Sequence, residues 1–357
     1  SGSGALVSAS YARTRAALAA VASGSGHMKI GCLGDSTQMG AYSLGSGTAT
    51  ADNRKVSHTP FFAAALNSVE HPAISASFVG DSLSNAIATY DPRCTITSGW
   101  ISSSVLGAGG KMIQNSTTTT SFQFLPNEPV DTFDIYYAKN TGLATFSVGR
   151  AGDTGSGTIS AVAAAGVGKY TFVGALCNVP LAINRIAGGG VFIIAIDAYN
   201  SAQKSIRCHN IGWSGSRVSD WIDASTAFGP LPSLKALGCD HYIITTGINE
   251  WGLLTDLATY KTQLTTLIDA LLTVGDVSLC TGYPSQKSGT TLAVQKTYID
   301  AIYAVAGSRN LVINDVWLKI GSWEQGNAFG YYSYSLHPGK ALLQLKAESD
   351  AAMILSL

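Results

Sequence analysis

Charged side chains are scarce in this sequence, and the two signs balance. Asp, Glu, Lys and Arg make up 12% of the 357 residues, about half the usual share, and 22 basic residues offset 22 acidic ones. The sequence has no long basic run, which excludes the electrostatic footprint of a nucleic-acid-binding protein. Apolar runs such as residues 191–196 are too short to cross a bilayer, and no secretory signal peptide is recognisable. We therefore expect neither a nucleic acid nor a membrane among the partners of this protein.

The sequence also lacks closely paired cysteines. Its six cysteines are widely spaced, and none belongs to the C-x-x-C pair of a zinc or redox site, so no metal centre is expected. We expect mostly buried free thiols. A bridge between Cys94 and Cys177, which fall in the same middle region, is an alternative that the sequence leaves open.

Glycine is abundant, at 39 residues, and indicates tight turns and closely packed strands. The length exceeds that of a usual single domain, which predicts two domains or one domain with a large insertion. The leading Ser-Gly-Ser-Gly is typical of a cloning remnant, so we expect the natural N-terminus to be missing. Residues 5–22 are Ala-rich and favour helix, and residues 23–26 are flexible Ser and Gly. Residues 1–26 are therefore interpreted as a tag remnant and an N-terminal connector.

Two segments, residues 27–80 and 205–357, alternate strands with helices. In the first, a strand ends at Leu33, and a helix capped by Thr59, with Pro60 at its first position, follows a long loop. In the second, strands are expected at 206–210, 241–245, 277–281 and 311–314, and helices at 218–224, 254–272, 292–305 and 340–355. This alternation predicts parallel strands in a three-layer α/β/α sandwich, with the site at the carboxyl ends of the strands.

Residues 81–204 follow a different pattern, with short runs of Thr, Val, Ile, Phe and Tyr broken by Gly, as in 132–137 and 190–196. Several strands at short spacing predict an antiparallel β-sandwich, which we interpret as jelly-roll-like. We interpret this segment as an inserted domain, and we expect it to bind carbohydrate.

The most informative segment is the apolar run 29–33 followed by Gly-Asp-Ser at 34–36, because it places the hydroxyl of Ser36 at the exposed end of a strand. A serine nucleophile also needs a base and donors for the oxyanion. Gly-Asp-Ser occurs in ordinary turns as well, since Asp and Ser bond their own backbone. The second copy, at residues 80–82, is interpreted as such a turn because no comparable segments follow it.

Three later segments supply the missing groups: Asn-Ile-Gly-Trp-Ser-Gly at 210–215, Gly-Ile-Asn at 247–249, and His337-Pro338 near the C-terminus. Taken in this order, Gly-Asp-Ser, Asn-x-Gly-x-x-Gly, Gly-x-Asn and His-Pro resemble the four blocks of the SGNH (GDSL-type) hydrolase family. Each block alone is weak evidence, but four in order, three of them after strand-like runs, make a specific pattern.

The resemblance implies a flavodoxin-like α/β/α fold and a set of catalytic residues. Ser36 is the expected nucleophile and His337 the general base, while the Gly215 N–H, the Asn249 amide and the Ser36 N–H are the expected oxyanion donors. Taken singly, Gly215 is also typical of a turn, Asn249 of a helix N-cap, and a lone histidine of a satisfied core residue. About 180 residues separate Ser36 from Gly215, against a few tens in the family, which supports the insertion.

The sequence departs from the family in the last block, where Tyr334 stands in place of the aspartate that orients the histidine. Impairing that aspartate in a serine protease lowers turnover by about 10⁴. Three alternatives remain open: a backbone carbonyl near Tyr334 or Ser335, a carboxylate such as Glu324 or Asp315, or an inactive site. We favour a carbonyl or Glu324, because Asp315 directly follows a strand and is expected to support the fold. Glu250 stands where the family often has Asp after the block asparagine. The alternative is that Glu250 caps the following helix instead.

The leading hypothesis is a serine esterase that removes acetyl groups from a polysaccharide through an acyl-enzyme, with no cofactor. Two alternatives stay open: a catalytically inactive glycan-binding module on the same fold, and a lipase or thioesterase acting on longer acyl chains. The Ala-rich connector, the low charge and the inserted sandwich also resemble the esterase domains of bacteriophage tail fibres and tailspikes. That resemblance implies an acylated bacterial surface glycan as the partner, a homotrimer, and a location on the virion tail or otherwise outside the cell.

Overall fold

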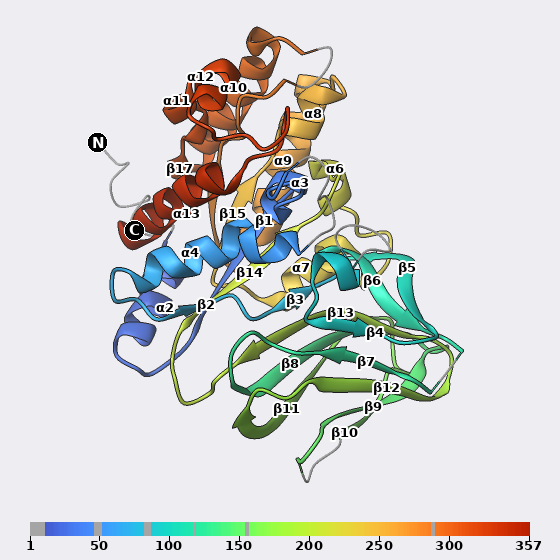
Figure 1. Ribbon diagram of the computed structural model, residues 1–357. Coiled ribbons are helices and arrows are strands. Elements are labelled where there is room, and N and C mark those ends of the chain that lie inside the picture. The colour runs from blue at the N-terminus through green and yellow to red at the C-terminus, as the bar shows by residue number, and fades with distance from the viewer. Residues whose placement is uncertain (1–10, 46–51, 82–86, 118, 154–156, 287–289) are drawn as a thin grey trace.

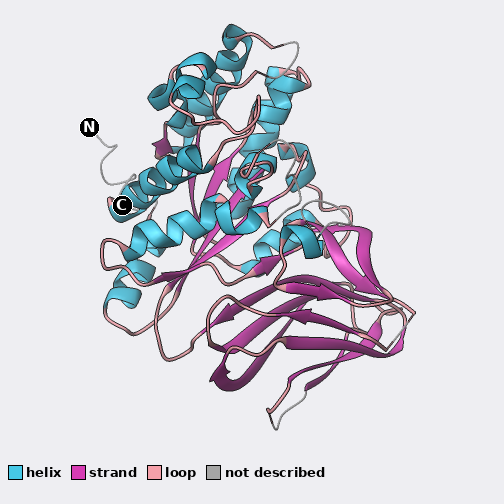
Figure 2. Cartoon of the chain, viewed as in Figure 1, coloured by secondary structure: helices cyan, strands magenta, loops and turns pink. Residues whose placement is uncertain are grey.

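The computed structural model describes residues 11–45, 52–81, 87–117, 119–153, 157–286 and 290–357. An α/β unit carries a β-sandwich on one side (Figure 1), and helices are confined almost entirely to the α/β unit (Figure 2). The sandwich is built from the middle of the chain, as the sequence predicts. No helix in the described part of the chain is long and apolar enough to cross a membrane.

The α/β unit is built on a six-stranded parallel sheet with strand order β17-β16-β15-β1-β14-β2. Its strands are β1 (Met28–Gly34), β2 (Ala73–Ile74), β14 (Ile206–Gly212), β15 (His241–Thr245), β16 (Asp276–Cys280) and β17 (Ile313–Asn314). Every residue of β15 and β16 is buried, as expected for parallel strands covered on both faces. Because β1 lies between β14 and β15, the loops that follow these three strands emerge side by side.

Helices cover both faces of this sheet. They are α2 (Ala12–Ala22), α3 (Ser36–Met39), η1 (Asn53–Val56), α4 (His58–Asn67), α6 (Val218–Trp221), α7 (Pro230–Leu237), α8 (Ile248–Gly252), α9 (Leu257–Leu272), α10 (Leu292–Arg309), α11 (Val316–Ile320), α12 (Trp323–Ala328) and α13 (Lys340–Leu355). Helix α4 packs against α13, and α9 packs against α10 (Figure 1). The crossover from β1 to β2 runs in one direction along the sheet, and those from β14 through β15 and β16 to β17 run in the other. Because such crossovers are right-handed, the two helix pairs lie on opposite faces. The three-layer prediction is confirmed.

The N-terminal region contains the main correction to the predicted fold. Residues 1–10, including the Ser-Gly segment, lie outside the described residues, but α2 is not a connector. The hydroxyl of Tyr11 donates to the Val277 carbonyl at 3.1 Å, and Thr14 bonds the Asp276 carboxylate at 2.8 Å. Helix α2 is therefore packed onto the amino ends of the strands. The Ala-rich composition indicated a helix but carried no information about its packing.

The predicted antiparallel β-sandwich is present. One sheet has the strand order β10-β9-β12-β7-β4 and the other β11-β8-β13-β6-β5, with β3 paired to β13. The strands are β3 (Phe78–Val79), β4 (Cys94–Ile96), β5 (Trp100–Gly107), β6 (Gly110–Asn115), β7 (Ser121–Phe124), β8 (Val130–Lys139), β9 (Ala144–Arg150), β10 (Gly157–Ser160), β11 (Gly166–Cys177), β12 (Leu181–Gly188) and β13 (Val191–Tyr199). Residues such as Phe122, Phe133, Phe146 and Ile193 form its core.

The bridge between Cys94 and Cys177 is not formed. Cys94 lies on β4 and Cys177 on β11, which belong to different sheets, and both thiols are free. Asp81 of the second Gly-Asp-Ser copy is fully buried and pairs with the backbone of Lys111, which supports a structural role. Ser82 lies outside the described residues.

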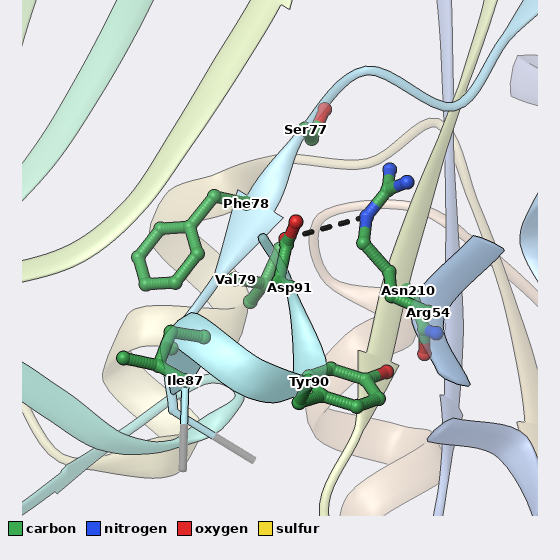
Figure 3. Close-up of a pocket in the computed structure, with 9 residues that line it drawn as sticks. Arg54, Ser77, Phe78, Val79, Ile87, Tyr90, Asp91 and Asn210 are labelled. Atoms are coloured by element: carbon green, nitrogen blue, oxygen red, sulfur yellow. Dashed lines mark ion pairs between the residues drawn. The ribbon is translucent and has the colours of Figure 1, made fainter. Parts of the chain in front are cut away.

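The junction between the two units is polar and buried (Figure 3). Helix α5 (Ile87–Tyr90) leads into the sandwich, and Asp91 at its end forms ion pairs with Arg93 at 2.6 Å and with Arg54 of η1 at 3.4 Å. Burial lowers the pKa of Arg54 to about 10, and the neighbouring Arg93 adds to this effect. The hydroxyl of Tyr90 donates to the Met39 carbonyl at 2.6 Å. Helix α5 thus contacts the end of α3, the helix that begins with Ser36.

Candidate active site

Ser36 is placed at the carboxyl edge of the sheet by the end of β1. Asp35 is the N-cap of α3, because its carboxylate accepts hydrogen bonds from the Thr37 N–H and hydroxyl, both at 2.8 Å. Position 34 tolerates only glycine, since a Cβ there would lie 2.8 Å from the Thr245 carbonyl oxygen. The Gly-Asp-Ser segment therefore combines a close approach of two strands, a helix cap and the first residue of a helix.

His337 lies in a tight turn immediately before α13. The Ser333 N–H donates to the His337 carbonyl at 3.2 Å, and the His337 N–H donates to the Tyr334 carbonyl at 3.0 Å. This turn brings the His337 Nε2 to 3.1 Å from the Ser36 Oγ, although the two residues are 301 positions apart. Ser36 and His337 are 8% and 6% exposed. The structure thus brings together the predicted nucleophile and base, and both residues are largely buried.

Gly215 and Asn249 lie in the loops that follow β14 and β15, on either side of β1. The Asn249 Nδ2 donates to the Ser216 carbonyl at 2.9 Å, so the two loops are joined across the end of β1. Gly215 has a φ of 77°, in the left-handed region that favours glycine, and its backbone is exposed. The structure therefore gathers all four predicted blocks around the carboxyl end of β1.

Glu250 forms a second link between these loops. Its Oε1 accepts from the Val218 N–H at 2.7 Å, and its Oε2 accepts from the Gly247 N–H at 3.1 Å. The bond to Gly247 caps α8, which agrees with the capping role that the sequence left open for Glu250. The bond to Val218 fixes the start of α6. Burial raises the pKa of Glu250 to about 7, and the nearby Asp35 carboxylate adds to the increase.

A raised pKa at Glu250 predicts a pH-dependent stability. The folded protein holds the Glu250 proton up to about pH 7, whereas the unfolded chain releases it near the ordinary pKa of 4.5. The contribution of this proton to the free energy of unfolding is therefore complete only below pH 4.5. The contribution falls as pH rises toward 7 and then levels off. We expect the difference in unfolding free energy between wild type and Glu250→Gln to follow this course in chemical denaturation. A difference that stays constant between pH 4.5 and 7 would contradict it.

The candidates for orienting His337 lie in different surroundings. Glu324 is exposed on the first turn of α12, where it lines a cavity of about 200 Å³ with Ser285 and Trp323, so its assignment stays a prediction. Asp315 accepts a hydrogen bond from the Tyr303 hydroxyl at 2.6 Å and caps α11. This supports the structural role expected of it.

The carbonyls near Tyr334 also have backbone partners. The Tyr334 carbonyl accepts from the His337 N–H at 3.0 Å, and the Ser335 carbonyl accepts from the Gln286 N–H at 2.9 Å. Both bonds hold the turn that carries His337.

A buried polar network that was not anticipated from the sequence contacts α3 through Gln38. Gln38 lies two residues after Ser36, and its Nε2 is 3.0 Å from the His58 Nδ1. The His58 Nε2 lies 2.9 Å from the Asp350 Oδ2, which also accepts from the Lys346 Nζ at 2.6 Å. Burial lowers the pKa of His58 to about 4, and Lys346 adds to the decrease, so this imidazole is neutral near pH 7. Sequence spacing gave no signal for this network, because its members come from three separate helices.

The described residues contain no group of three His, Cys, Asp or Glu side chains that could hold a metal ion.

Comparison with solved structures identifies the fold. A peptidoglycan O-acetylesterase is similar over 98% of both chains, with a TM-score of 0.71 at 17% sequence identity. An active-site mutant of a family two carbohydrate esterase from Clostridium thermocellum is 12% identical, covering 69% of this chain and 94% of its own, with a TM-score of 0.35. A lipase/acylhydrolase from Enterococcus faecalis is 17% identical, covering 43% of this chain and 77% of its own, with a TM-score of 0.38.

No protein-family model and no curated protein sequence matches the chain. The structural similarity shows an SGNH hydrolase fold with added antiparallel sheets, as the sequence motifs predict.

Proposed function

We propose that this protein is a serine esterase that removes O-acetyl groups from a polysaccharide. The observation that carries the proposal is the 3.1 Å contact between the Ser36 Oγ and the His337 Nε2 at the carboxyl edge of the parallel sheet. A serine hydroxyl within hydrogen-bond distance of an imidazole is the arrangement required for an activated nucleophile. The loops bearing Gly215 and Asn249 flank this pair and carry N–H groups of the kind that stabilise an oxyanion.

In the proposed reaction, the Ser36 Oγ attacks the ester carbonyl carbon while its proton passes to the His337 Nε2. The carbonyl π electrons move to the oxygen, and N–H groups of Ser36, Gly215 and Asn249 stabilise this oxyanion. Collapse of the tetrahedral intermediate expels the sugar oxygen, which takes the proton from His337. Water then attacks the acyl carbonyl carbon while its proton passes to His337. The bond between that carbon and the Ser36 Oγ breaks, the Oγ takes the proton back from His337, and acetate is released.

Two other observations, a matching solved structure and the inserted sandwich, support an acetylated glycan as the substrate. A solved structure that matches this fold over 98% of the chain is a peptidoglycan O-acetylesterase. The inserted sandwich offers a second unit for carbohydrate binding, and its strand orders β11-β8-β13-β6 and β10-β9-β12-β7 support a jelly-roll topology. A lipase or thioesterase would instead favour long acyl chains.

Hydrolysis of defined esters tests this proposal. We expect faster hydrolysis of a chromogenic acetate ester than of the matching octanoate, and release of acetate from an O-acetylated bacterial polysaccharide. Preference for octanoate would favour the lipase alternative. Binding of the polysaccharide with no ester hydrolysis would favour the glycan-binding module.

Asn249→Ala tests the proposed oxyanion donor. Removal of one such donor typically lowers turnover by about 10² to 10³. We expect a decrease of this size in kcat with little change in KM, because the donor acts on charge that develops only in the transition state. The thermal midpoint should be measured as well, since Asn249 also bonds the Ser216 carbonyl. An unchanged kcat in a folded variant would remove Asn249 from the mechanism.

The biological setting is a further part of the proposal. A bacteriophage tail fibre or tailspike, acting outside the bacterial cell on its surface glycan, agrees with the compact sandwich insertion and the low charge. This setting predicts a homotrimer, which light scattering on the purified protein would detect as three times the mass of one chain. A monomeric mass would argue against it.

A further inference from the structure

Two tyrosines surround the imidazole of His337. The Tyr42 ring, in the loop after α3, lies 4.6 Å from the His337 ring between centroids, at an interplanar angle of 41°. Tyr334 stacks on Tyr42 at 5.4 Å and lies 6.2 Å from His337. The position that holds aspartate in the resembling family therefore supplies an aromatic ring to a cluster of three.

The backbone holds Tyr42 in an unfavourable conformation to make this contact. Its φ of 61° lies in the left-handed region, which is unusual for a bulky residue. Strain of this kind persists only where surrounding contacts impose it, and it is concentrated at functional sites. The Tyr42 carbonyl accepts from the Ser333 hydroxyl at 2.6 Å and from the Gly45 N–H at 2.9 Å. The first of these bonds ties the Tyr42 loop directly to the turn that carries His337.

We infer that Tyr42, supported by Tyr334, positions the His337 imidazole and stabilises its protonated form. This inference rests on the proposed function, in which the His337 Nε2 receives the proton of Ser36. The imidazolium then lies within about 6 Å of the negative face of the Tyr42 ring, the range of cation–π attraction. Tyr334 stacks on Tyr42 and also lies 6.2 Å from the His337 ring, so the three rings form a triangle. The ring pair thus has two of the effects of an orienting carboxylate: it fixes the imidazole plane and it favours the cation.

Other titratable groups near the site must be kept constant in a test. Asp35 caps α3, and Glu250, whose pKa is raised by burial and by Asp35, caps α8. Variants that change only the two rings leave these charges in place.

Tyr42→Leu removes the ring, and Tyr42→Phe keeps it. We expect Tyr42→Leu to lower kcat for a chromogenic acetate ester by about 3- to 30-fold with KM unchanged, and to lower the apparent pKa of the base in the pH profile of kcat/KM. Tyr42→Phe should stay within about twofold of wild type, because the cation attracts the ring face and not the hydroxyl. Phe329→Leu is the control, since Phe329 lies in the loop that carries Tyr334 and His337 but is 73% exposed, with its ring 5.8 Å from that of Tyr331 between centroids.

The outcomes separate this inference from the proposed function. Wild-type kcat and pH profile in a folded Tyr42→Leu variant would overturn the inference while leaving the esterase intact, and so would equal losses in Tyr42→Phe and Tyr42→Leu. If Tyr42→Leu does not fold, Tyr334→Leu replaces it, because that side chain is 47% exposed, and a smaller decrease with the same shift of the profile is expected. A wild-type protein without Ser36-dependent hydrolysis would instead refute the proposed function.

Discussion

Ser36→Ala is expected to abolish ester hydrolysis, with a loss in kcat of about 10⁴-fold or more. Alanine removes the only atom that attacks the carbonyl carbon in the proposed reaction, while the backbone N–H at position 36 remains. The side chain is small and 8% exposed, so the fold should be preserved. Initial rates on a chromogenic acetate ester, with the thermal midpoint measured in parallel, would test this expectation.

His337→Gln should cause a loss of similar size, because the Ser36 Oγ then has no imidazole to take its proton. The double variant Ser36→Ala/His337→Gln is expected to be no slower than either single variant, since residues that act as a unit are not additive. His71→Gln is a suitable control, because it changes a partly exposed histidine that follows α4. Additive losses in the double variant, or hydrolysis that survives Ser36→Ala, would show that the two side chains do not form a catalytic pair.

Asp350→Asn is expected to destabilise the fold by about 3–5 kcal/mol. Lys346 and Asp350 are fully buried, one turn apart on α13, and the carboxylate also contacts His58 and Asn314. Burial alone would raise the pKa of Asp350, but Lys346 and His58 outweigh this and hold the pKa well below its ordinary value. Neutralising Asp350 leaves the Lys346 ammonium buried without a counter-charge. The midpoint of chemical unfolding would measure the loss.

Glu348→Gln is the matched control, because it removes an exposed carboxylate from the same helix and should change stability by less than about 0.5 kcal/mol. Adding Lys346→Met to Asp350→Asn should restore much of the lost stability, since replacing both members of a buried ion pair is far less costly than breaking it. Equal stability of Asp350→Asn and Glu348→Gln would exclude a central role for the network. Activity should fall with stability, because His58 connects Asp350 to Gln38 on the Ser36 helix.

The strands and the last helix were predictable because their patterns are local. The apolar residues of β15 and the helix from Lys340 to Leu355 agree with the expected ranges, and the alternation of strand and helix implied the parallel sheet. The short helices α3 and α7 were not anticipated, and α4 begins after Ser57, two residues before the expected cap Thr59. Both Ser57 and Thr59 are residue types preferred at an N-cap, so the sequence alone does not fix the residue at which this helix begins.

The candidate site was predictable where a motif has chemical meaning by itself. A serine after a strand, a histidine before the final helix and an asparagine after Gly247 could each be assigned a role from their spacing and order. The supporting residues could not. Tyr42 carries no recognisable signal in the sequence, and the Lys346–Asp350 pair has the i, i+4 spacing typical of an exposed helix face.

The amino-acid sequence alone determined the order of elements, the antiparallel insertion and the chemical identity of the four blocks, because each is encoded within a few neighbouring residues. Only the tertiary structure decided that the Ser36 Oγ meets the His337 Nε2, that α2 packs against the sheet, and that the Cys94 and Cys177 thiols stay apart. These outcomes depend on which surfaces are buried together once the whole chain packs. Contacts between residues hundreds of positions apart are set by that packing and leave no mark in local composition or periodicity.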